Sequence, residues 1–191
     1  MISEWCYYES KLTKQSCEDI IKLAAEIKPT KGVVGVSGGG MGEHEMRKSV
    51  VRFIQSKDKK FEQLFDGMWK LAIETNEINF NFHISKLDFI QLAEYDAAYQ
   101  GKYDRHHDVF WMNNDPKYHR KISMIVQLTD PSEYEGGDFE FFNLVNFPDK
   151  EIIRKQGTIL FFPSFLEHQA TPVTKGKRHS LAAWFEGPKW R

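Results

Sequence analysis

The spacing of apolar residues predicts two helices in the N-terminal part of the chain. The first begins at Ser16, whose hydroxyl suits a helix N-cap, and its apolar stripe ends near Ile27, before Pro29. The second runs from about Asp58 to Glu77. Its apolar residues recur at helical spacing and form one stripe: Phe61, Leu64, Phe65, Met68, Trp69 and Ile73.

The pattern changes after Ile78, where short apolar runs alternate with turn residues. The predicted strands are Asp88–Tyr95, Lys102–Asp108, Lys121–Leu128, Asp138–Phe142, Thr158–Phe162, Gln169–Val173 and His179–Phe185. The predicted turns are Asp130-Pro131, Glu135-Gly136-Gly137, Asn146-Phe147-Pro148 and Lys175-Gly176. Helices followed by many short strands predict an α+β fold: a double-stranded β-helix (jelly roll) with N-terminal helices packed on one sheet. We expect a single domain over residues 1–191, with helical support at about 15–77 and a jelly-roll core at about 85–188.

Two segments are predicted to be irregular loops. Residues 32–42 are rich in glycine but lack the Gly-Lys-[Ser/Thr] sequence of a phosphate-binding loop, so we expect a flexible loop that could fold over a peptide substrate. Residues 109–119 follow a predicted strand and contain Trp111 and Pro116. We expect this segment to act as a lid.

Composition narrows the class of protein. The chain has 41% hydrophobic and 14% aromatic residues, as globular proteins do, and its formal net charge of −1 argues against nucleic acid or membrane as a default partner. No apolar run is long enough to span a membrane, and the first residues lack the pattern of a secretory signal. Cys6 and Cys17 form no Cys-x-x-Cys pair, so we expect free thiols and a cytoplasmic protein.

Two histidines and one aspartate carry the strongest chemical signal. His106 and Asp108 lie two residues apart on a predicted strand, so both side chains point to the same side. His168, near a distant strand, completes a two-histidine, one-carboxylate set, the pattern of non-heme Fe(II) oxygenases. Three protein ligands leave positions open for a co-substrate and O2. Arg178, ten residues after His168, is then a fixed cation placed to hold the far end of a dicarboxylate.

Other chemistries have weaker support. Zinc also binds His, His and carboxylate, but the chain has no His-Glu-x-x-His sequence of a zinc peptidase. It has no Gly-x-Ser-x-Gly sequence for a nucleophilic serine either. His107 stands between the two ligands and should point to the opposite face, as a packing or surface histidine.

Three segments taken together carry a family resemblance. They are Tyr99–Asp108, Arg120–Phe141 and Leu160–Arg178. They resemble the 2-oxoglutarate/Fe(II)-dependent dioxygenases, and within these the prolyl 4-hydroxylase-like branch with its bacterial and viral members. The resemblance extends over about residues 85–188. It implies that His106, Asp108 and His168 bind Fe(II), and that Arg178 holds the 5-carboxylate of 2-oxoglutarate, where collagen-type members use lysine.

The resemblance also implies further contacts to the co-substrate. A family tyrosine lies upstream of the His-x-Asp sequence, and Tyr95, Tyr99 and Tyr103 compete for this role. Register favours Tyr95, with Tyr99 second. A second family tyrosine falls at Gln127, whose amide could replace the hydrogen bond of the phenol.

Three more residues are candidates near the substrate. Ser180 and Trp184 share a strand face with Arg178, so Ser180 could bind the same carboxylate and Trp184 could form a wall on the substrate side. An ordinary strand serine and a core tryptophan remain the alternatives. Arg120 matches a family arginine on the substrate side, and a surface charge is the alternative there.

The implied activity is a hydroxylase that consumes 2-oxoglutarate and O2, yields succinate and CO2, and uses ascorbate as a supporting reductant. The resemblance implies prolyl residues of a protein or peptide as the substrate. The same chemistry on a free amino acid or a nucleobase stays open, although the near-neutral charge argues against nucleic acid. A non-catalytic jelly-roll binding module is the third alternative, which replacement of a ligand or of Arg178 would have favoured.

Overall fold

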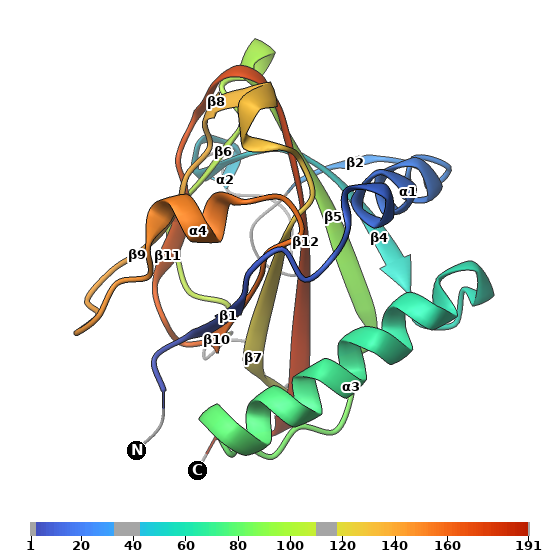
Figure 1. Ribbon diagram of the computed structural model, residues 1–191, viewed down its shortest axis with the longest axis vertical. Coiled ribbons are helices and arrows are strands. Elements are labelled where there is room, and N and C mark those ends of the chain that lie inside the picture. The colour runs from blue at the N-terminus through green and yellow to red at the C-terminus, as the bar shows by residue number, and fades with distance from the viewer. Residues whose placement is uncertain (1–2, 33–42, 110–117, 191) are drawn as a thin grey trace.

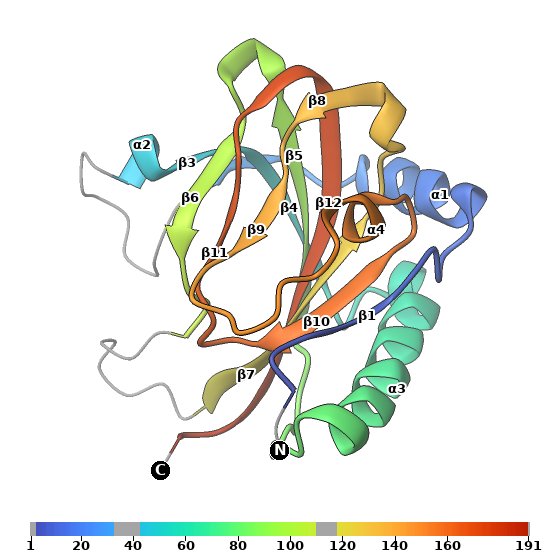
Figure 2. The ribbon, with the colours of Figure 1, turned by 60° about the vertical axis from the view of Figure 1, so that its left-hand side comes forward.

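The computed structural model describes residues 3–32, 43–109 and 118–190. Two antiparallel β-sheets face each other, and helices α1 (Lys14–Ala24) and α3 (Glu62–Asn79) lie on the outer side of the larger one (Figure 1). The turned view in Figure 2 separates the two sheets. The predicted jelly roll with helices on one sheet is confirmed.

The larger sheet is called the major sheet here. Its strand order is β1 (Cys6–Tyr8), β10 (Ile159–Pro163), β7 (Tyr118–Gln127), β12 (Val173–Pro188), β5 (Phe89–Asp96), β4 (Val50–Gln55) and β2 (Thr30–Lys31), with β8 (Tyr134–Gly136) paired to β12. The minor sheet has the order β3 (Arg47–Lys48), β6 (Lys102–His106), β11 (His168–Ala170) and β9 (Phe139–Phe141). Short helical elements complete the described chain: α2 (Glu43–Met46), η1 (Lys59–Phe61), η2 (Ala97–Tyr99), η3 (Pro131–Glu133) and α4 (Lys150–Arg154).

Alternation along the major sheet separates two environments, because successive strand residues point to opposite faces. On β12, Leu181, Ala183 and Phe185 belong to the core cluster that also contains the buried faces of α1 and α3. Ser180, Ala182 and Trp184 alternate with them in sequence and line a cavity on the opposite face. Burial of apolar side chains beneath the helices therefore fixes which β12 residues face the interior between the sheets.

The first helix differs from its predicted bounds. α1 begins at Lys14, and Thr13 caps it by accepting a hydrogen bond from the backbone N–H of Ser16. The prediction that Ser16 is the cap was therefore wrong, since a Ser/Thr cap pairs with the N–H three residues later. The second helix follows η1 and ends at Asn79, close to the predicted range.

The prediction also missed strands in the N-terminal part. β3 and β4 lie between the two helices, and β4 joins the major sheet beside β5. The run Val50–Gln55 carries strand-forming residues, with Val51 and Ile54 fully buried. α4 was missed as well; Asp149 caps it by accepting from the N–H groups of Glu151 and Ile152.

The C-terminal strand is longer than predicted. Lys175-Gly176 does not end a strand, because β12 continues from Val173 to Pro188. Gly176 has φ +69°, and a Cβ there would lie 2.0 Å from the carbonyl oxygen of Glu133 on the neighbouring η3. The glycine therefore allows β12 to pass close to this segment, so a turn signal in the sequence corresponds to a local distortion within a strand.

Other expectations can be compared only in part. The predicted loops at 32–42 and 109–119 fall largely on residues 33–42 and 110–117, outside the described residues; Tyr118 and His119 belong to β7. Cys6 and Cys17 are free thiols as expected, and burial raises the pKa of each to about 11. None of the helices in the described ranges combines the length and apolar character that a membrane crossing requires.

Two glycines give opposite predictions for stability. Gly67 is exposed in the middle of α3, and a Cβ there would meet no atom within 4 Å, so Gly67→Ala should raise the free energy of unfolding by about 1 kcal/mol. Gly157 has φ +79°, and its Cβ would lie 2.0 Å from the carbonyl oxygen of Leu12. Gly157→Ala is therefore expected to lower the free energy of unfolding. Urea unfolding followed by circular dichroism measures both, and a destabilised Gly67→Ala would show that α3 needs the glycine.

Candidate metal centre and co-substrate cavity

Strand pairing in the minor sheet brings the two histidines together. His106 is the last residue of β6 and His168 the first of β11, and they lie directly opposite each other in the register. Asp108 lies two residues beyond the end of β6, where its N–H donates to the carbonyl of Ser164 at 2.8 Å. The strand alternation used in the prediction therefore stops at His106, and this hydrogen bond positions the aspartate instead.

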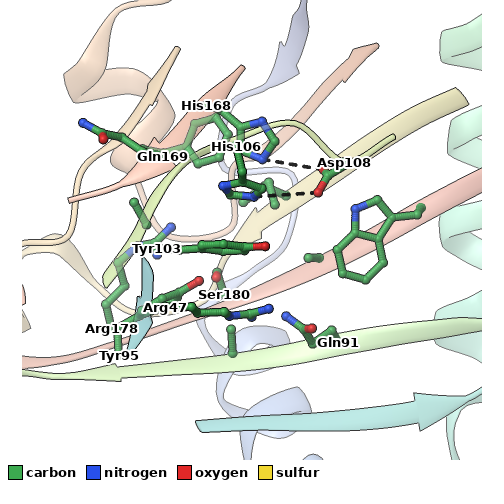
Figure 3. Close-up of a pocket in the computed structure, with 16 residues that line it drawn as sticks. Arg47, Gln91, Tyr95, Tyr103, His106, Asp108, His168, Gln169, Arg178 and Ser180 are labelled. Carbon is green, nitrogen blue, oxygen red and sulfur yellow. Dashed lines mark ion pairs between the residues drawn. The ribbon is translucent and has the colours of Figure 1, made fainter. Parts of the chain in front are cut away.

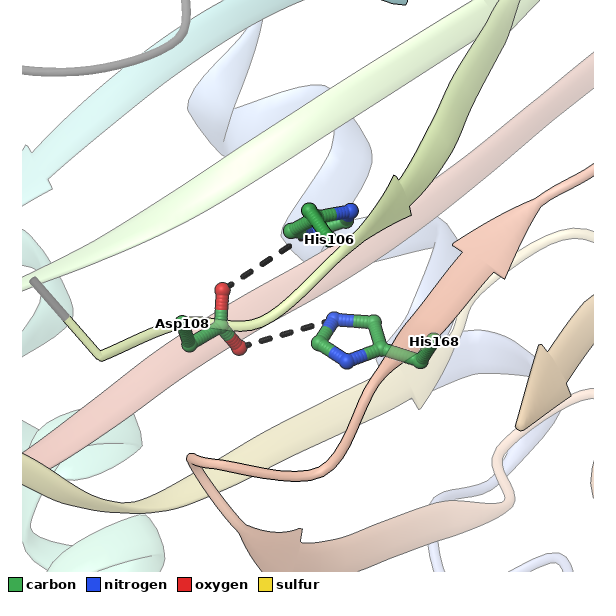
Figure 4. Close-up of side chains that lie close together, drawn as sticks. All are labelled: His106, Asp108 and His168. Carbon is green, nitrogen blue, oxygen red and sulfur yellow. Dashed lines mark ion pairs between the residues drawn. The ribbon is translucent and has the colours of Figure 1, made fainter. Parts of the chain in front are cut away.

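The three side chains converge on one point (Figure 4). One potential ligand atom from each of His106, Asp108 and His168 lies within 4.8 Å of the others. The Nε2 atoms of His106 and His168 are 3.8 Å and 3.6 Å from the two carboxylate oxygens of Asp108. The predicted triad is thus assembled with a spacing that a single metal ion can bridge.

Backbone carbonyls orient both imidazoles. Nδ1 of His106 donates to the carbonyl of Asp104 at 2.8 Å, and Nδ1 of His168 donates to that of Leu166 at 2.9 Å. A proton held on Nδ1 leaves the Nε2 lone pair available for a metal. Burial, followed by the neighbouring His168, lowers the pKa of His106 to about 3, so its imidazole is neutral at physiological pH.

Two buried serines support Asp108. Ser123 donates its hydroxyl to Asp108 Oδ2 at 2.6 Å, and the Ser164 hydroxyl lies 2.9 Å from that of Ser123. Burial by itself raises the pKa of Asp108, but His168, His106, Arg120 and the Ser123 hydrogen bond together lower it to about 2. The carboxylate is therefore ionised and fixed in orientation before any metal binds.

The cavity next to the triad extends to Arg178 (Figure 3). Arg178 is only 2% exposed, and its Nη2 donates to Gln127 Oε1 at 2.9 Å. Its Nε is buried without a hydrogen-bond partner in the described structure. Gly137 makes space for this side chain, because a Cβ there would lie 3.1 Å from Arg178 Cδ. Gly137 thus contributes to the site, and the turn predicted at Glu135-Gly136-Gly137 was wrong in part, because Tyr134–Gly136 form strand β8.

The structure separates the predicted tyrosines. Tyr95 is buried, lines the cavity and lies opposite Arg178 in the register, with the guanidinium carbon 5.4 Å from its ring centroid. Tyr99 is not among the residues that line the cavity; its hydroxyl donates to the carbonyl of Glu94 at 3.1 Å. Tyr103, the third candidate, does line the cavity and stacks on the His106 ring at 3.5 Å.

The remaining candidates also differ in position. Ser180 and Trp184 line the cavity, whereas Arg120 is not among the residues that line it; its guanidinium carbon lies 3.9 Å from the ring centroid of Trp184. Gln127 contacts the cavity through Arg178. His107 is exposed, as expected for a residue pointing away from the metal face.

Three polar residues of the cavity escaped the sequence prediction. Arg47, Gln91 and Gln169 all line it. Arg47 lies on β3, a strand that the prediction missed, so its orientation was unknown. Gln91 lies on the predicted strand that carries Tyr95, four residues away, and the alternation of that strand would have placed both on one face.

The support of Asp108 by Ser123 leads to a prediction. Ser123→Ala should weaken binding of Co(II) to the protein without co-substrate by about tenfold, because partners that orient a metal ligand typically contribute this much. Titration of the Co(II) absorption bands measures the affinity. Ser180→Ala is the matched control, since Ser180 lines the same cavity without a hydrogen bond to Asp108 in the described structure, and its affinity should stay unchanged. Equal affinity of Ser123→Ala and the wild type would contradict the proposed support.

Comparisons with known proteins agree with this geometry. The sequence pattern of the 2OG-Fe(II) oxygenase superfamily matches residues 90–186 of the 191. A PKHD-type hydroxylase from Synechococcus sp. (strain CC9311) is 36% identical over 88 residues, which are 46% of this chain and 37% of that relative. The match therefore spans little more than a third of that relative's length.

Solved structures share the fold at low sequence identity. A prolyl-4-hydroxylase from Pseudomonas putida aligns with TM-score 0.73 and 17% identity over 98% of this chain and 94% of its own. A prolyl hydroxylase from Trichoplax adhaerens, solved with a peptide fragment of the hypoxia inducible factor oxygen degradation domain, aligns with TM-score 0.71 and 17% identity over 96% and 83%. These structures confirm the predicted fold, and the family pattern confirms the resemblance to the 2-oxoglutarate/Fe(II)-dependent dioxygenases. The matched range covers more than half of the chain and spans both histidines, the aspartate and Arg178, so this chain belongs to the 2OG-Fe(II) oxygenase superfamily.

Proposed function

We propose that this protein is a 2-oxoglutarate- and O2-dependent hydroxylase that acts on prolyl residues of a protein or peptide, with residues 1–191 forming one oxygenase domain. The observation that carries the proposal is the pairing of the His-Asp-His cluster with the buried Arg178 across one cavity. Within the described residues no carboxylate pairs with Arg178. A buried guanidinium without a protein counter-ion favours an anionic ligand.

The donor set suits Fe(II). Two neutral imidazoles and one carboxylate from His106, His168 and Asp108 would bind the ion through three positions and leave the others open. Fe(II) with 2-oxoglutarate and O2 supplies the oxidising chemistry that hydroxylates a C–H bond, with succinate and CO2 as co-products. The protein residues hold these partners in place, and no separate general base is required.

Arg178 would bind the 5-carboxylate of 2-oxoglutarate. The hydrogen bond to Gln127 fixes one nitrogen of the guanidinium and leaves the buried Nε as a donor for the carboxylate. Gln127, at the position of a family tyrosine, is thereby placed beside Arg178, and we propose that it contributes to co-substrate binding through this arginine. Tyr95 and Ser180 line the same end of the cavity, and we propose them as further contacts to the co-substrate.

We propose that the substrate binds on the side of the cavity lined by Trp184, whose ring the Arg120 guanidinium contacts. The Trichoplax adhaerens relative in complex with a peptide supports a peptide substrate here. A free amino acid would use the same iron chemistry and remains the second candidate.

Succinate formation from 2-oxoglutarate tests the proposal. The protein with Fe(II), ascorbate and O2 is incubated with proline-containing peptides, free amino acids or oligonucleotides, and products with an added oxygen are sought by mass spectrometry. Peptide-stimulated turnover with oxidation at proline is expected. Stimulation by free amino acids or oligonucleotides alone would overturn the substrate class. Absence of succinate throughout, with iron bound, would favour a non-catalytic binding module.

Loss of a ligand should abolish turnover. Asp108→Ala removes the only carboxylate that lines the cavity in the described structure, so both iron binding and succinate formation should fall to background. Asp104→Ala is the control, because Asp104 lies near Asp108 in the sequence but forms an ion pair with Lys102 instead. This variant should retain iron binding and succinate formation. Near-wild-type activity of Asp108→Ala would remove Asp108 from the triad.

Loss of Arg178 should act on the co-substrate. Arg178→Gln is expected to raise the apparent KM for 2-oxoglutarate by about 100-fold while leaving Co(II) affinity unchanged, because a buried anion loses its cation. Arg105→Gln is the control: it removes an arginine whose partner is the exposed Glu167, outside the cavity. An unchanged KM in Arg178→Gln would exclude Arg178 from co-substrate binding.

A further inference from the structure

We propose that the substrate carries a carboxylate close to the carbon that is hydroxylated, and that Arg47 binds it. This inference rests on the proposed hydroxylase function and specifies the chemical class of its substrate. It depends on the position of Arg47 in the cavity, on its partners, and on the other charges there.

Arg47 lines the cavity and is separated from the metal-binding histidine His106 by the ring of Tyr103. Its position on β3 is set by pairing with Tyr103 on β6, and only 6% of the residue is exposed. The guanidinium carbon is 4.4 Å from the Tyr103 ring centroid, and the other face of that ring stacks on His106 (Figure 3). Arg47 is thus one aromatic ring away from a proposed iron ligand.

Arg47 has few partners for a buried cation. Its Nε donates to the Ser49 hydroxyl at 2.9 Å, and its guanidinium lies over the Tyr103 ring. Among the residues whose side chains the structure describes, which leave out 33–44 and 110–117, no Asp or Glu lies within ion-pair distance of Arg47. A guanidinium that is almost fully buried without an anion is unfavourable, so its site is best satisfied when a ligand brings one.

The other charges proposed for the loaded cavity cancel one another and leave the positive charge of Arg47 without a counter-charge. Among the described residues that line the cavity, Asp108 is the only acidic one, and it is a proposed metal ligand. Fe(II), the Asp108 carboxylate, the two carboxylates of 2-oxoglutarate and Arg178 sum to zero. Arg120 adds a positive charge nearby, and Glu186, which lies opposite it in the register, offsets that charge. The cavity therefore favours an additional negative charge, which the substrate has to supply.

A second buried donor faces the same space. Trp184 lines the cavity, and its indole Nε1 is buried without a hydrogen-bond partner in the described structure. Guanidinium and indole N–H groups can only donate hydrogen bonds. A carboxylate offers two acceptor oxygens and is the group that a guanidinium binds most strongly.

Two kinds of substrate present such a carboxylate. One is a peptide with an acidic residue beside the target proline, and the other is a proline that itself carries a free α-carboxylate, at a C-terminus or as the free amino acid. Both share the same chemistry, so the experiment includes matched compounds for each source.

The probes are amide-capped heptapeptides with one central proline and either Glu or Gln at each neighbouring position. Peptides that end in proline, with a free or an amidated C-terminus, and proline with prolinamide complete the set. Turnover is measured by succinate and product mass. Affinity is measured by calorimetry on the Mn(II) protein loaded with N-oxalylglycine, an unreactive analogue of 2-oxoglutarate, so that binding is read independently of catalysis.

One carboxylate compound should bind about tenfold or more tightly than its neutral match in the wild type. Arg47→Gln should abolish that preference, and Arg47→Lys should retain part of it. The affinity for N-oxalylglycine should stay unchanged in both variants. Lys48→Gln removes a neighbouring charge on the same strand and should keep the preference.

Three outcomes would overturn the inference. Equal binding and turnover of the carboxylate and neutral compounds would remove the anion requirement while leaving prolyl hydroxylation intact. If Arg47→Gln weakened the binding of the carboxylate and the neutral compound equally and altered the Co(II) absorption bands, Arg47 would instead support the packing of Tyr103 and His106. Absence of turnover with every proline compound would contradict the proposed function, and this inference would fall with it.

Discussion

The pairing of β6 with β11 is the constraint on which the site depends. It places His106 opposite His168, although 62 positions separate them in the sequence, and backbone carbonyls then fix both rings. Asp108 joins them through its N–H bond to Ser164 and its carboxylate bond to Ser123. Because backbone groups provide most of this order, the ligand set is preorganised, and the binding of an ion requires little rearrangement.

The major sheet provides the rigid second wall. Its outer face is covered by α1 and α3, and the apolar core beneath them fixes the register of β5, β7 and β12. Arg178 is held on this wall between Tyr95 and Gln127, with the glycine at 137 leaving room for it. A buried cation facing a metal-binding cluster across a narrow cavity selects a ligand with two anionic ends. The same reasoning, applied to Arg47, extends selection from the co-substrate to the substrate.

Much of this arrangement could be predicted from the sequence. Six of the seven strands predicted after Ile78 lie within three residues of their predicted bounds, whereas β12 is much longer and β8 was predicted as a turn. His106, Asp108, His168 and Arg178 line one cavity, as their spacing indicated. The errors have local causes. Gly176 looks like a turn but allows a close approach within β12, and the strand signal at Val50–Gln55 was overlooked between two helices. With β3 missed as well, Arg47 could not be assigned to the cavity.

The sequence by itself determined the ligand types, their order and the alternation that puts Ser180 and Trp184 on the face of Arg178. Local chemistry and strand period suffice for such statements, since they concern residues close in the chain. Only the tertiary structure decided which tyrosines line the cavity, that Gln127 contacts Arg178, that two serines support Asp108, and that Arg47 is buried beside Tyr103. These contacts join residues from different strands, and they depend on sheet register and on the packing of one sheet against the other, which no local pattern specifies.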